Sequence, residues 1–373
     1  MIEKTKSMVK YGKVWLENES MVRSMERNNP FTIAFGREPI SLIKREKQLE
    51  EIKTSFLNDN PLTYAYVITG IRGSGKTVLL TSTCQEFSKM DDWIVVELNP
   101  DRNMLESFAA KLYENSHLKY KFLKKELSFS FQGLTFSIKG ENPVYDVENL
   151  LEKMLKVLKK HNKKVLVAID EVSNNKEVRT FIHPFQILNR GNLPIFLLMT
   201  GLFENVSRLE NDKSLTFLYR APKIDLDPLD LFLIKNSYMK ELNVNEETAI
   251  ELAKLTKGYA FGYQSLGYLA FNSGGIINDD LLRKYDEYLK TFVYDKVWSE
   301  LSNVDHKILE KLATNESGDV EYIYKELNMK KSTFSPYRDK LIKNGVIISK
   351  GWGFIDFALP RFREYIDILK QFE

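Results

Sequence analysis

The feature that most constrains the fold of this chain is the run GIRGSGKT at residues 70–77, which matches the pattern G-x-x-x-x-G-K-[ST]. In such a loop the backbone N–H groups turn inward around phosphate oxygens, Lys76 reaches the outer phosphates, and the Thr77 hydroxyl can ligate Mg²⁺. A strand-like run at 64–69 precedes the loop and a helix-like run follows it. A glycine-rich turn is the alternative, but it leaves the fixed spacing unexplained. The expected nucleotide-binding residues are Gly70, Arg72, Gly73, Ser74, Gly75, Lys76, Thr77 and Val78.

The length and composition set broad limits on the rest of the chain. A length of 373 residues predicts two or three domains, and 43% hydrophobic with 28% charged residues is typical of a soluble globular protein. The formal net charge of +3 is nearly balanced, so any nucleic-acid-binding surface must be local. The single cysteine, Cys84, cannot form an intramolecular disulfide, which indicates a reducing compartment and a packing role for its side chain.

No apolar run is long enough to span a bilayer. The longest, at 193–202, is interrupted by Pro194, Thr200 and Gly201. Residues 1–6 lack the apolar core of a signal peptide. We therefore expect a cytoplasmic protein without a membrane partner.

Short apolar runs predict the strands of a parallel sheet. They lie at 64–69, 93–98, 165–169, 195–199 and 223–226, with helical patterns between most of them. Strands that alternate with helices predict an α/β sheet covered on both faces. Between the second and third of these strands, apolar and polar residues alternate on either side of Gln132-Gly133. This pattern predicts a β-hairpin insertion near 126–139, either an accessory element or a partner-binding one.

The strand patterns give way to helical patterns after Asp227. Helices are expected at 231–242, 246–256, 264–271 and 281–292. From about residue 304, three further helical patterns and two short strands around Gly351-Trp352-Gly353 predict a winged helix-turn-helix. The expected organisation is an N-terminal extension (1–35), an ATPase core (36–227), a helical lid (228–295) and the winged helix (296–373).

Two strand ends supply the chemistry that fits a phosphate site. Asp170, at the end of the buried run 165–169, would hold Mg²⁺ through water, and Glu171 would orient or deprotonate the attacking water. A carboxylate helix cap is the alternative for this pair. Thr200 ends the next strand along the chain, where it can sense the γ-phosphate or hold the water.

Arg220 lies just before the last predicted strand. An arginine at that edge often stabilises transition-state charge on a nucleotide bound by a neighbouring subunit, which would make the active form a homo-oligomer. A plain surface arginine is the equal alternative. The expected catalytic residues are thus Lys76, Glu171, Thr200 and Arg220, with ATP and Mg²⁺ as the bound groups.

Together the loop at 70–77, Asp170-Glu171, Thr200, Arg220, the sheet exit at 225–229 and the winged helix resemble prokaryotic AAA+ ATPases of the archaeal-ATPase and Orc/Cdc6-like group, close to the STAND signalling ATPases. The resemblance covers about residues 36–373. It implies a P-loop NTPase sheet of the AAA+ type with a helical lid. In AAA+ proteins a segment before the P-loop passes beside the adenine, so the candidates for a base pocket are Pro39, Ile40 and Arg45, which otherwise form a helix entry.

One departure from the AAA+ pattern concerns the lid. AAA+ initiators usually carry a nucleotide-sensing arginine there, whereas the corresponding stretch 258–264 has none. This moves the interpretation toward the STAND-like side.

The C-terminal helix-turn-helix pattern leaves two functions open. One is DNA binding, with expected contacts Lys330, Lys331, Arg338, Lys340, Lys343 and Trp352. The other is docking of a protein partner or autoinhibition, because acidic residues make the whole segment nearly neutral. The first hypothesis is an ATPase whose nucleotide state sets assembly or loading on double-stranded DNA, and the second is a regulatory switch. A nucleotide kinase is disfavoured, because P-loop kinases rarely place Asp-Glu after the third strand or append a winged helix.

Overall fold

A five-stranded parallel sheet forms the centre of the first half of the chain. The computed structural model describes residues 28–34, 38–114, 128–131, 134–137, 146–212, 215 and 217–371. Its large sheet has the order β2-β5-β6-β1-β7. The strands are β1 (Ala65–Thr69), β2 (Trp93–Leu98), β5 (Lys164–Ile169), β6 (Ile195–Gly201) and β7 (Lys223–Asp225). The predicted α/β sheet is confirmed, and each strand lies within a residue or two of its expected position.

Helices cover both faces of this sheet, as the apolar strands require. Alternate residues of each strand face opposite sides, so Val67 and Val167 pack in one core while Ile68 and Ala168 pack in the other. The second face is covered by α2 (Glu46–Leu57) and α3 (Lys76–Ser88), which buries Cys84. The first face is covered by α4 (Met104–Glu114), α6 (Val147–Lys160), α7 (Lys176–Arg190) and α8 (Phe203–Glu210).

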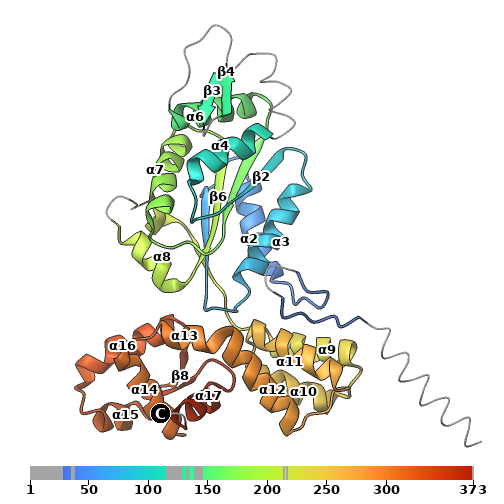
Figure 1. The fold of residues 1–373 in the computed structure, drawn as a ribbon, viewed down its shortest axis with the longest axis vertical. Helices are drawn as coiled ribbons and strands as arrows, with labels where there is room; N and C mark the ends of the chain where they lie inside the picture. The colour runs from blue at the N-terminus through green and yellow to red at the C-terminus, as the bar shows by residue number, and fades with distance from the viewer. Residues whose placement is uncertain are drawn as a thin grey trace, which may run out of the picture.

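A small antiparallel hairpin stands where the alternating pattern predicted one. β3 (Ser128–Phe131) pairs with β4 (Leu134–Ser137), and Figure 1 places it at the end of the molecule remote from the later helices. The rest of the expected insertion and the packing of its phenylalanines lie outside the described residues and side chains.

The second half of the chain is helical and lies below the sheet in Figure 1. Its first helices are α9 (Leu231–Leu242), α10 (Glu246–Thr256), α11 (Ala260–Asn272) and α12 (Asp279–Leu289), followed by a π-helical turn (Lys290–Tyr294) and α13 (Asp295–Ser299). Helix α11 begins at Ala260 rather than at Gln264, one turn earlier than expected, and Tyr259 before it makes no side-chain cap that would mark the start. No helix in the described part of the chain is both long and apolar enough to cross a membrane.

The last elements follow without a break in packing. They are α14 (Asn303–Thr314), α15 (Val320–Glu326), α16 (Lys331–Lys343), the antiparallel strands β8 (Ile347–Gly351) and β9 (Phe354–Phe357), and α17 (Phe362–Lys370). Helix α17 was not expected from the sequence. Residues of α9–α12 and of α14–α17 share one hydrophobic cluster, so the two helical groups form a continuous core.

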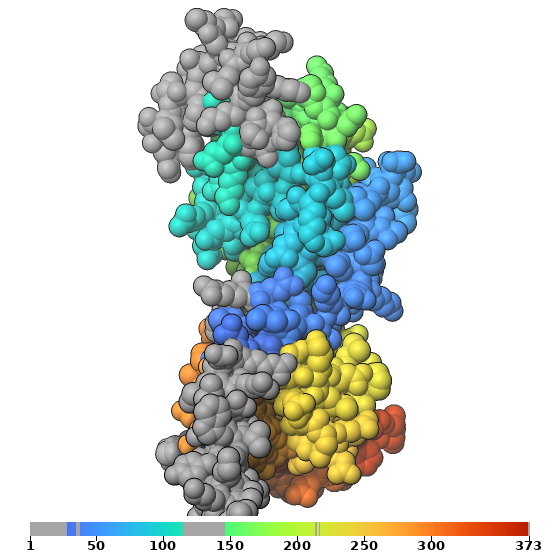
Figure 2. All heavy atoms as spheres, turned by 90° about the vertical axis from the view of Figure 1, so that its right-hand side faces the viewer, coloured from blue at the N-terminus to red at the C-terminus, as the bar shows by residue number. Residues whose placement is uncertain are grey.

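The segment before α2 links the two halves of the molecule. Phe31 is buried among lid side chains, against the rings of Tyr238 and Tyr263 and over Gly267. Figure 2 shows the stretch that continues into α2, in blue, lying between the sheet part above and the yellow lid below. Most of the expected N-terminal extension lies outside the described residues.

Candidate functional site

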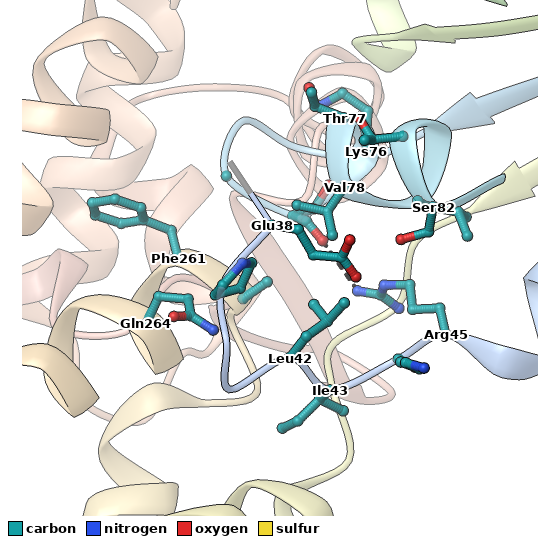
Figure 3. A pocket seen from close by; sticks show the side chains of 18 of the residues that line it. Glu38, Leu42, Ile43, Arg45, Lys76, Thr77, Val78, Ser82, Phe261 and Gln264 are labelled. Carbon is teal, nitrogen blue, oxygen red and sulfur yellow. Dashed lines mark hydrogen bonds between the residues drawn. The ribbon is translucent and has the colours of Figure 1, made fainter. Parts of the chain in front are cut away.

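A cavity of about 800 Å³ opens at the carboxyl edge of the sheet. The loop at 70–77, the first turns of α3, the segment at 32–45 and the start of α11 line it. Figure 3 shows side chains from these elements turned toward one another, with Arg45 and Val78 on one side and Phe261 and Gln264 on the other. Parallel strands present their carboxyl ends at one edge, which is where ligands bind in open α/β sheets.

The phosphate loop has the backbone that its glycines predict. Gly73 and Gly75 have φ values of 74° and 93°, in the left-handed region that glycine adopts without strain. The Lys76 ammonium donates to the carbonyl oxygens of Gly70 (3.0 Å) and Ile71 (2.8 Å). Burial, and after it the Arg72 charge, lowers the pKa of Lys76 to about 8, although Asp170, Glu171 and Glu300 oppose the shift.

Thr77 of α3 and the polar residues at the ends of β5 and β6 form one hydrogen-bonded chain. Strand β6 lies between β1 and β5, which places Thr200 between the phosphate loop and Asp170. Thr77 Oγ1 donates to Asp170 Oδ2 at 2.8 Å, and Thr200 Oγ1 donates to Asp170 Oδ1. The backbone N–H of Glu171 donates in turn to Thr200 Oγ1 at 2.9 Å.

Glu171 combines an uncommon backbone conformation with an exposed side chain. Its φ of 56° lies in the left-handed region, which is uncommon for a residue other than glycine and is typical of functional sites. The side chain is 62% exposed, and Oε1 lies 3.4 Å from Arg72 Nη2. The catalytic candidate is therefore paired with a residue of the phosphate loop itself.

The Thr77–Asp170 pair fits a magnesium ion bound together with a nucleotide. No group of three or more His, Cys, Asp or Glu side chains that could hold a metal occurs among the described residues. Mg²⁺ is usually held by one or two protein oxygens with phosphate oxygens and water completing its shell. A hydroxyl and a carboxylate 2.8 Å apart beside the phosphate loop match that donor set.

The start of α11 packs directly on the phosphate loop, which the sequence did not indicate. The Tyr259 hydroxyl donates to the Arg72 carbonyl at 2.6 Å, and the Phe261 N–H donates to the Gly73 carbonyl at 3.0 Å. A side chain at Gly73 would collide with the Tyr259 hydroxyl. The lid thus binds two carbonyls of the loop through the stretch 258–264, which contains no arginine.

The three base-pocket candidates have different positions. Arg45 Nη2 donates to the carbonyls of Ser74 (3.1 Å) and Asp227 (2.8 Å), so it links the phosphate loop to the exit from the sheet. Burial lowers the pKa of Arg45. Pro39 lines the cavity. Ile40 does not, and it is 80% exposed.

Arg220 is not brought to this cavity. It ends a short 3₁₀ turn (Leu218–Arg220), is exposed, and does not line the cavity. The carbonyl of Pro222 accepts from the Val67 N–H, so the chain at Arg220 lies toward the amino end of β1, away from the phosphate loop. Within one chain, therefore, Arg220 does not contribute to the cavity beside the phosphate loop.

Instead, residues after α13 contact the phosphate loop. Arg72 Nη2 donates to Glu300 Oε1 at 3.2 Å. A Cβ added to Gly345 would lie 2.1 Å from Ile71 Cγ2, so the turn after α16 rests against the loop. Lys343 stands over the Phe203 ring, 5.6 Å from its centre. Two contacts therefore place the turn after α16 and the segment before α14 against the phosphate loop, and the third joins the end of α16 to α8.

These contacts change the interpretation of the expected DNA-binding residues. Lys340 Nζ is 2.8 Å from the carboxylate of Asp305, which is fully buried, and Arg338 pairs with Asp339. Lys343 faces α8 as described above. Lys330, Lys331 and the 95% exposed Trp352 remain on the surface. Half of the expected set therefore has internal partners.

Comparison with known proteins agrees with this architecture. An ATPase domain predominantly from Archaea matches residues 42–192, and a domain of unknown function matches residues 291–366. No protein among those with curated descriptions matches the chain.

Solved structures resemble the chain over most of its length. The Orc2 protein of Aeropyrum pernix in its ADPNP–ADP complexes has 14% sequence identity and a TM-score of 0.58, covering 91% of this chain and 96% of that chain. Cdc6p from Pyrobaculum aerophilum has 15% identity and a TM-score of 0.47, covering 92% of this chain and 97% of that chain. The Orc2 likeness shows the fold, which is that of an AAA+ P-loop ATPase.

Proposed function

We propose that this chain, with its AAA+ P-loop fold, binds ATP together with Mg²⁺ and hydrolyses it to ADP and phosphate. The observation that carries the proposal is the hydrogen-bonded chain from Thr77 through Asp170 to Thr200 and Glu171, beside the cavity of about 800 Å³. A phosphate loop alone supports binding, whereas a metal-side carboxylate with an adjacent exposed carboxylate also supports attack by water.

The residues divide the reaction between them. The loop amides and Lys76 would bind the β- and γ-phosphates, and Thr77 and Asp170 would hold Mg²⁺, which supplies positive charge to the phosphate oxygens. Glu171 would accept a proton from the water whose oxygen forms the new bond to the γ-phosphorus. The bond from that phosphorus to the bridging oxygen of ADP breaks, and the proton passes on to solvent. Thr200 would keep Asp170 and the Glu171 backbone in place.

Two variants test this assignment. Lys76→Ala should lose productive ATP binding, because it removes the point charge aimed at the outer phosphates. Glu171→Gln should bind ATP and lose turnover by about 10²–10⁴-fold, the usual range for removal of a positioned proton acceptor. ATP affinity by calorimetry and phosphate release give the two readouts. Normal turnover in folded Glu171→Gln would place the base elsewhere.

For the C-terminal part we propose a winged helix-turn-helix that associates with double-stranded DNA in a nucleotide-dependent way. The order of α14, α15, α16 and the β8–β9 hairpin supports the assignment, and Lys330, Lys331 and Trp352 offer exposed contacts. A second candidate is a regulatory switch, and a specific observation favours it. The contacts of Glu300 and Gly345 with the phosphate loop dock this part of the chain at the ATP site.

Salt-dependent binding of duplex DNA by the full chain separates the two candidates. If α16 contacts phosphates, affinity should fall as salt rises, and Lys331→Ala should reduce the log–log slope by about one. Glu326→Gln, on the exposed end of α15, provides a control for nonspecific charge effects. Absence of DNA binding at low salt, with and without ATP, would leave the regulatory switch as the function.

A further inference from the structure

The cations around the cavity are unequally available to a nucleotide. Those that line it in the described residues are Lys44, Arg45, Arg72, Lys76 and Lys89. Arg45 is committed to two backbone carbonyls, and Lys89 is exposed and paired with Glu86. Lys44 belongs to the segment before α2, whereas Arg72 lies in the phosphate loop with its Nη2 3.4 Å from Glu171 Oε1. Arg72 is therefore the cation that accompanies Lys76 at the Glu171 end of the cavity.

Arg72 is also poorly satisfied where it stands. Its Nε is buried without a hydrogen-bond partner. A single terminal nitrogen, Nη2, serves both carboxylates, at 3.2 Å from Glu300 and 3.4 Å from Glu171. A guanidinium has five N–H donors arranged to bind carboxylate or phosphate at two points, and this arrangement uses few of them. The side chain can gain further hydrogen bonds by turning toward a phosphate.

The part of the lid that contacts the phosphate loop has no cation of its own. Positions 258–264 contain no arginine or lysine, yet this stretch is the part of the lid that is hydrogen-bonded to the phosphate loop. Charge that develops on the outer phosphate must then be met by a cation from another element, and phosphoryl transfer gains most from such a cation.

We propose that Arg72 contacts the outer phosphate of the bound nucleotide, and that Glu300 holds its guanidinium away from that phosphate while the segment after α13 is docked on the loop. This inference rests on the proposed function and specifies how the site is regulated. Movement of Glu300 away from the loop frees Arg72, and the rotation of Arg72 toward phosphate also releases Glu171 Oε1 to bind water. The proposed regulation is thus an exchange in which Arg72 leaves Glu300 and Glu171 and binds the outer phosphate.

The first test measures binding rather than turnover. Affinities for ATPγS and for ADP, both with Mg²⁺, are compared by calorimetry in the parent chain and in Arg72→Ala, Arg72→Lys and Glu300→Gln. Arg72→Ala should weaken the affinity for ATPγS about tenfold or more and change the affinity for ADP much less. The variant loses a hydrogen bond to the charged outer phosphate, which ATPγS has and ADP lacks. Arg72→Lys should retain part of this preference.

Glu300→Gln should shift the preference in the opposite direction, by a few-fold toward ATPγS, because it removes the competing charge. In the double variant Arg72→Ala with Glu300→Gln, the preference should equal that of Arg72→Ala alone, since the proposed effect of Glu300 on the outer phosphate requires Arg72. Glu326→Gln is the matched control, an exposed glutamate of the C-terminal part that pairs with Lys311 far from the loop. It should behave as the parent.

The outcomes separate this inference from the proposed function. If Arg72→Ala weakens ATPγS and ADP equally, or if Glu300→Gln behaves as Glu326→Gln, the inference is wrong even when the parent hydrolyses ATP. If the preferences shift as expected but the parent releases no phosphate, hydrolysis is wrong and the role of Arg72 stands. Where the parent is active, phosphate release should rise in Glu300→Gln and fall in Arg72→Ala. If Arg72→Ala does not fold, Arg72→Gln replaces it.

Discussion

The carboxyl edge of the sheet and the C-terminal half of α16 both concentrate polar side chains that the sequence marks as functional, but these side chains have different partners. At the sheet edge, Thr77, Asp170 and Thr200 bind one another. On α16, Lys340 and Lys343 bind groups that no motif indicated, namely Asp305 and the Phe203 ring. Residues at the ends of parallel strands are brought together by the order of the strands in the sheet. A row of like charges on a helix does not show which face of the helix packs against the rest of the protein.

The strongest test of this contrast is Arg220, the one catalytic candidate that lies away from the sheet edge. If it serves a nucleotide bound by a neighbouring copy, Arg220→Ala should bind ATP nearly as the parent does and lose turnover by about 10³-fold or more. Phosphate release measured beside ATP affinity gives the answer. Turnover at the parental rate would leave the sheet edge sufficient and Arg220 a surface residue.

Mixing two inactive variants shows whether Arg220 acts between chains. An Arg220→Ala chain keeps its phosphate loop and can receive the arginine from a Lys76→Ala chain, so the mixture should recover part of the activity if the copies assemble. Lack of recovery at every ratio, although both variants are folded and assembled, would contradict action between chains.

A middle-sized effect is expected at the internal ion pair of the C-terminal part. Lys340→Ala leaves the buried Asp305 carboxylate without its charged partner, so the free energy of unfolding should fall by about 1–3 kcal/mol. Urea unfolding followed by circular dichroism measures it. Lys331→Ala, on the exposed start of the same helix, should stay within about 0.5 kcal/mol of the parent. Equal small losses in both would mean that Lys340 is as free for DNA as Lys331.

The smallest effect concerns the contact between α16 and α8. Lys343 over Phe203 should contribute about 0.5–1 kcal/mol as a cation–π pair. A double-mutant cycle of Lys343→Ala and Phe203→Leu, read by urea unfolding, isolates the pair from the separate effects of each change. Strict additivity would show that this contact does not hold α16 to the core.

The sequence predicted the parts of the fold that depend on local patterns. The cores of β5 and β6 are continuous apolar runs, β2 is apolar except at Glu97, and the phosphate loop with Asp170-Glu171 is defined by spacing alone. Helix α17 was missed because its amphipathic pattern follows the hairpin closely, in a stretch with no clear start signal. Its first helical residue, Phe362, follows Arg361, which makes no side-chain cap and has a φ of 52°.

The parts of the site that could not be predicted are contacts between distant segments. Tyr259 and Glu300 reach the phosphate loop from positions about 190 and 230 residues away, so no window of the sequence contains both partners. Ile40 and Arg220 were predicted to act at the nucleotide site because they lie next to recognisable elements in the sequence. In the folded chain neither side chain lines the cavity, and Ile40 is exposed. The sequence alone thus predicted the residues proposed to act on phosphate more readily than the residues proposed to regulate them.

Gly345 shows how two constraints can meet at one position. It has a φ of 67° after the end of α16, where glycine is favoured, and its missing side chain leaves the space that Ile71 fills. In evolutionary terms, positions 71 and 345 are not free to drift independently. A larger residue at 345 would push on the loop that must wrap phosphate, while a smaller residue at 71 would permit it. Variation among related chains should therefore appear at these two positions as paired exchanges.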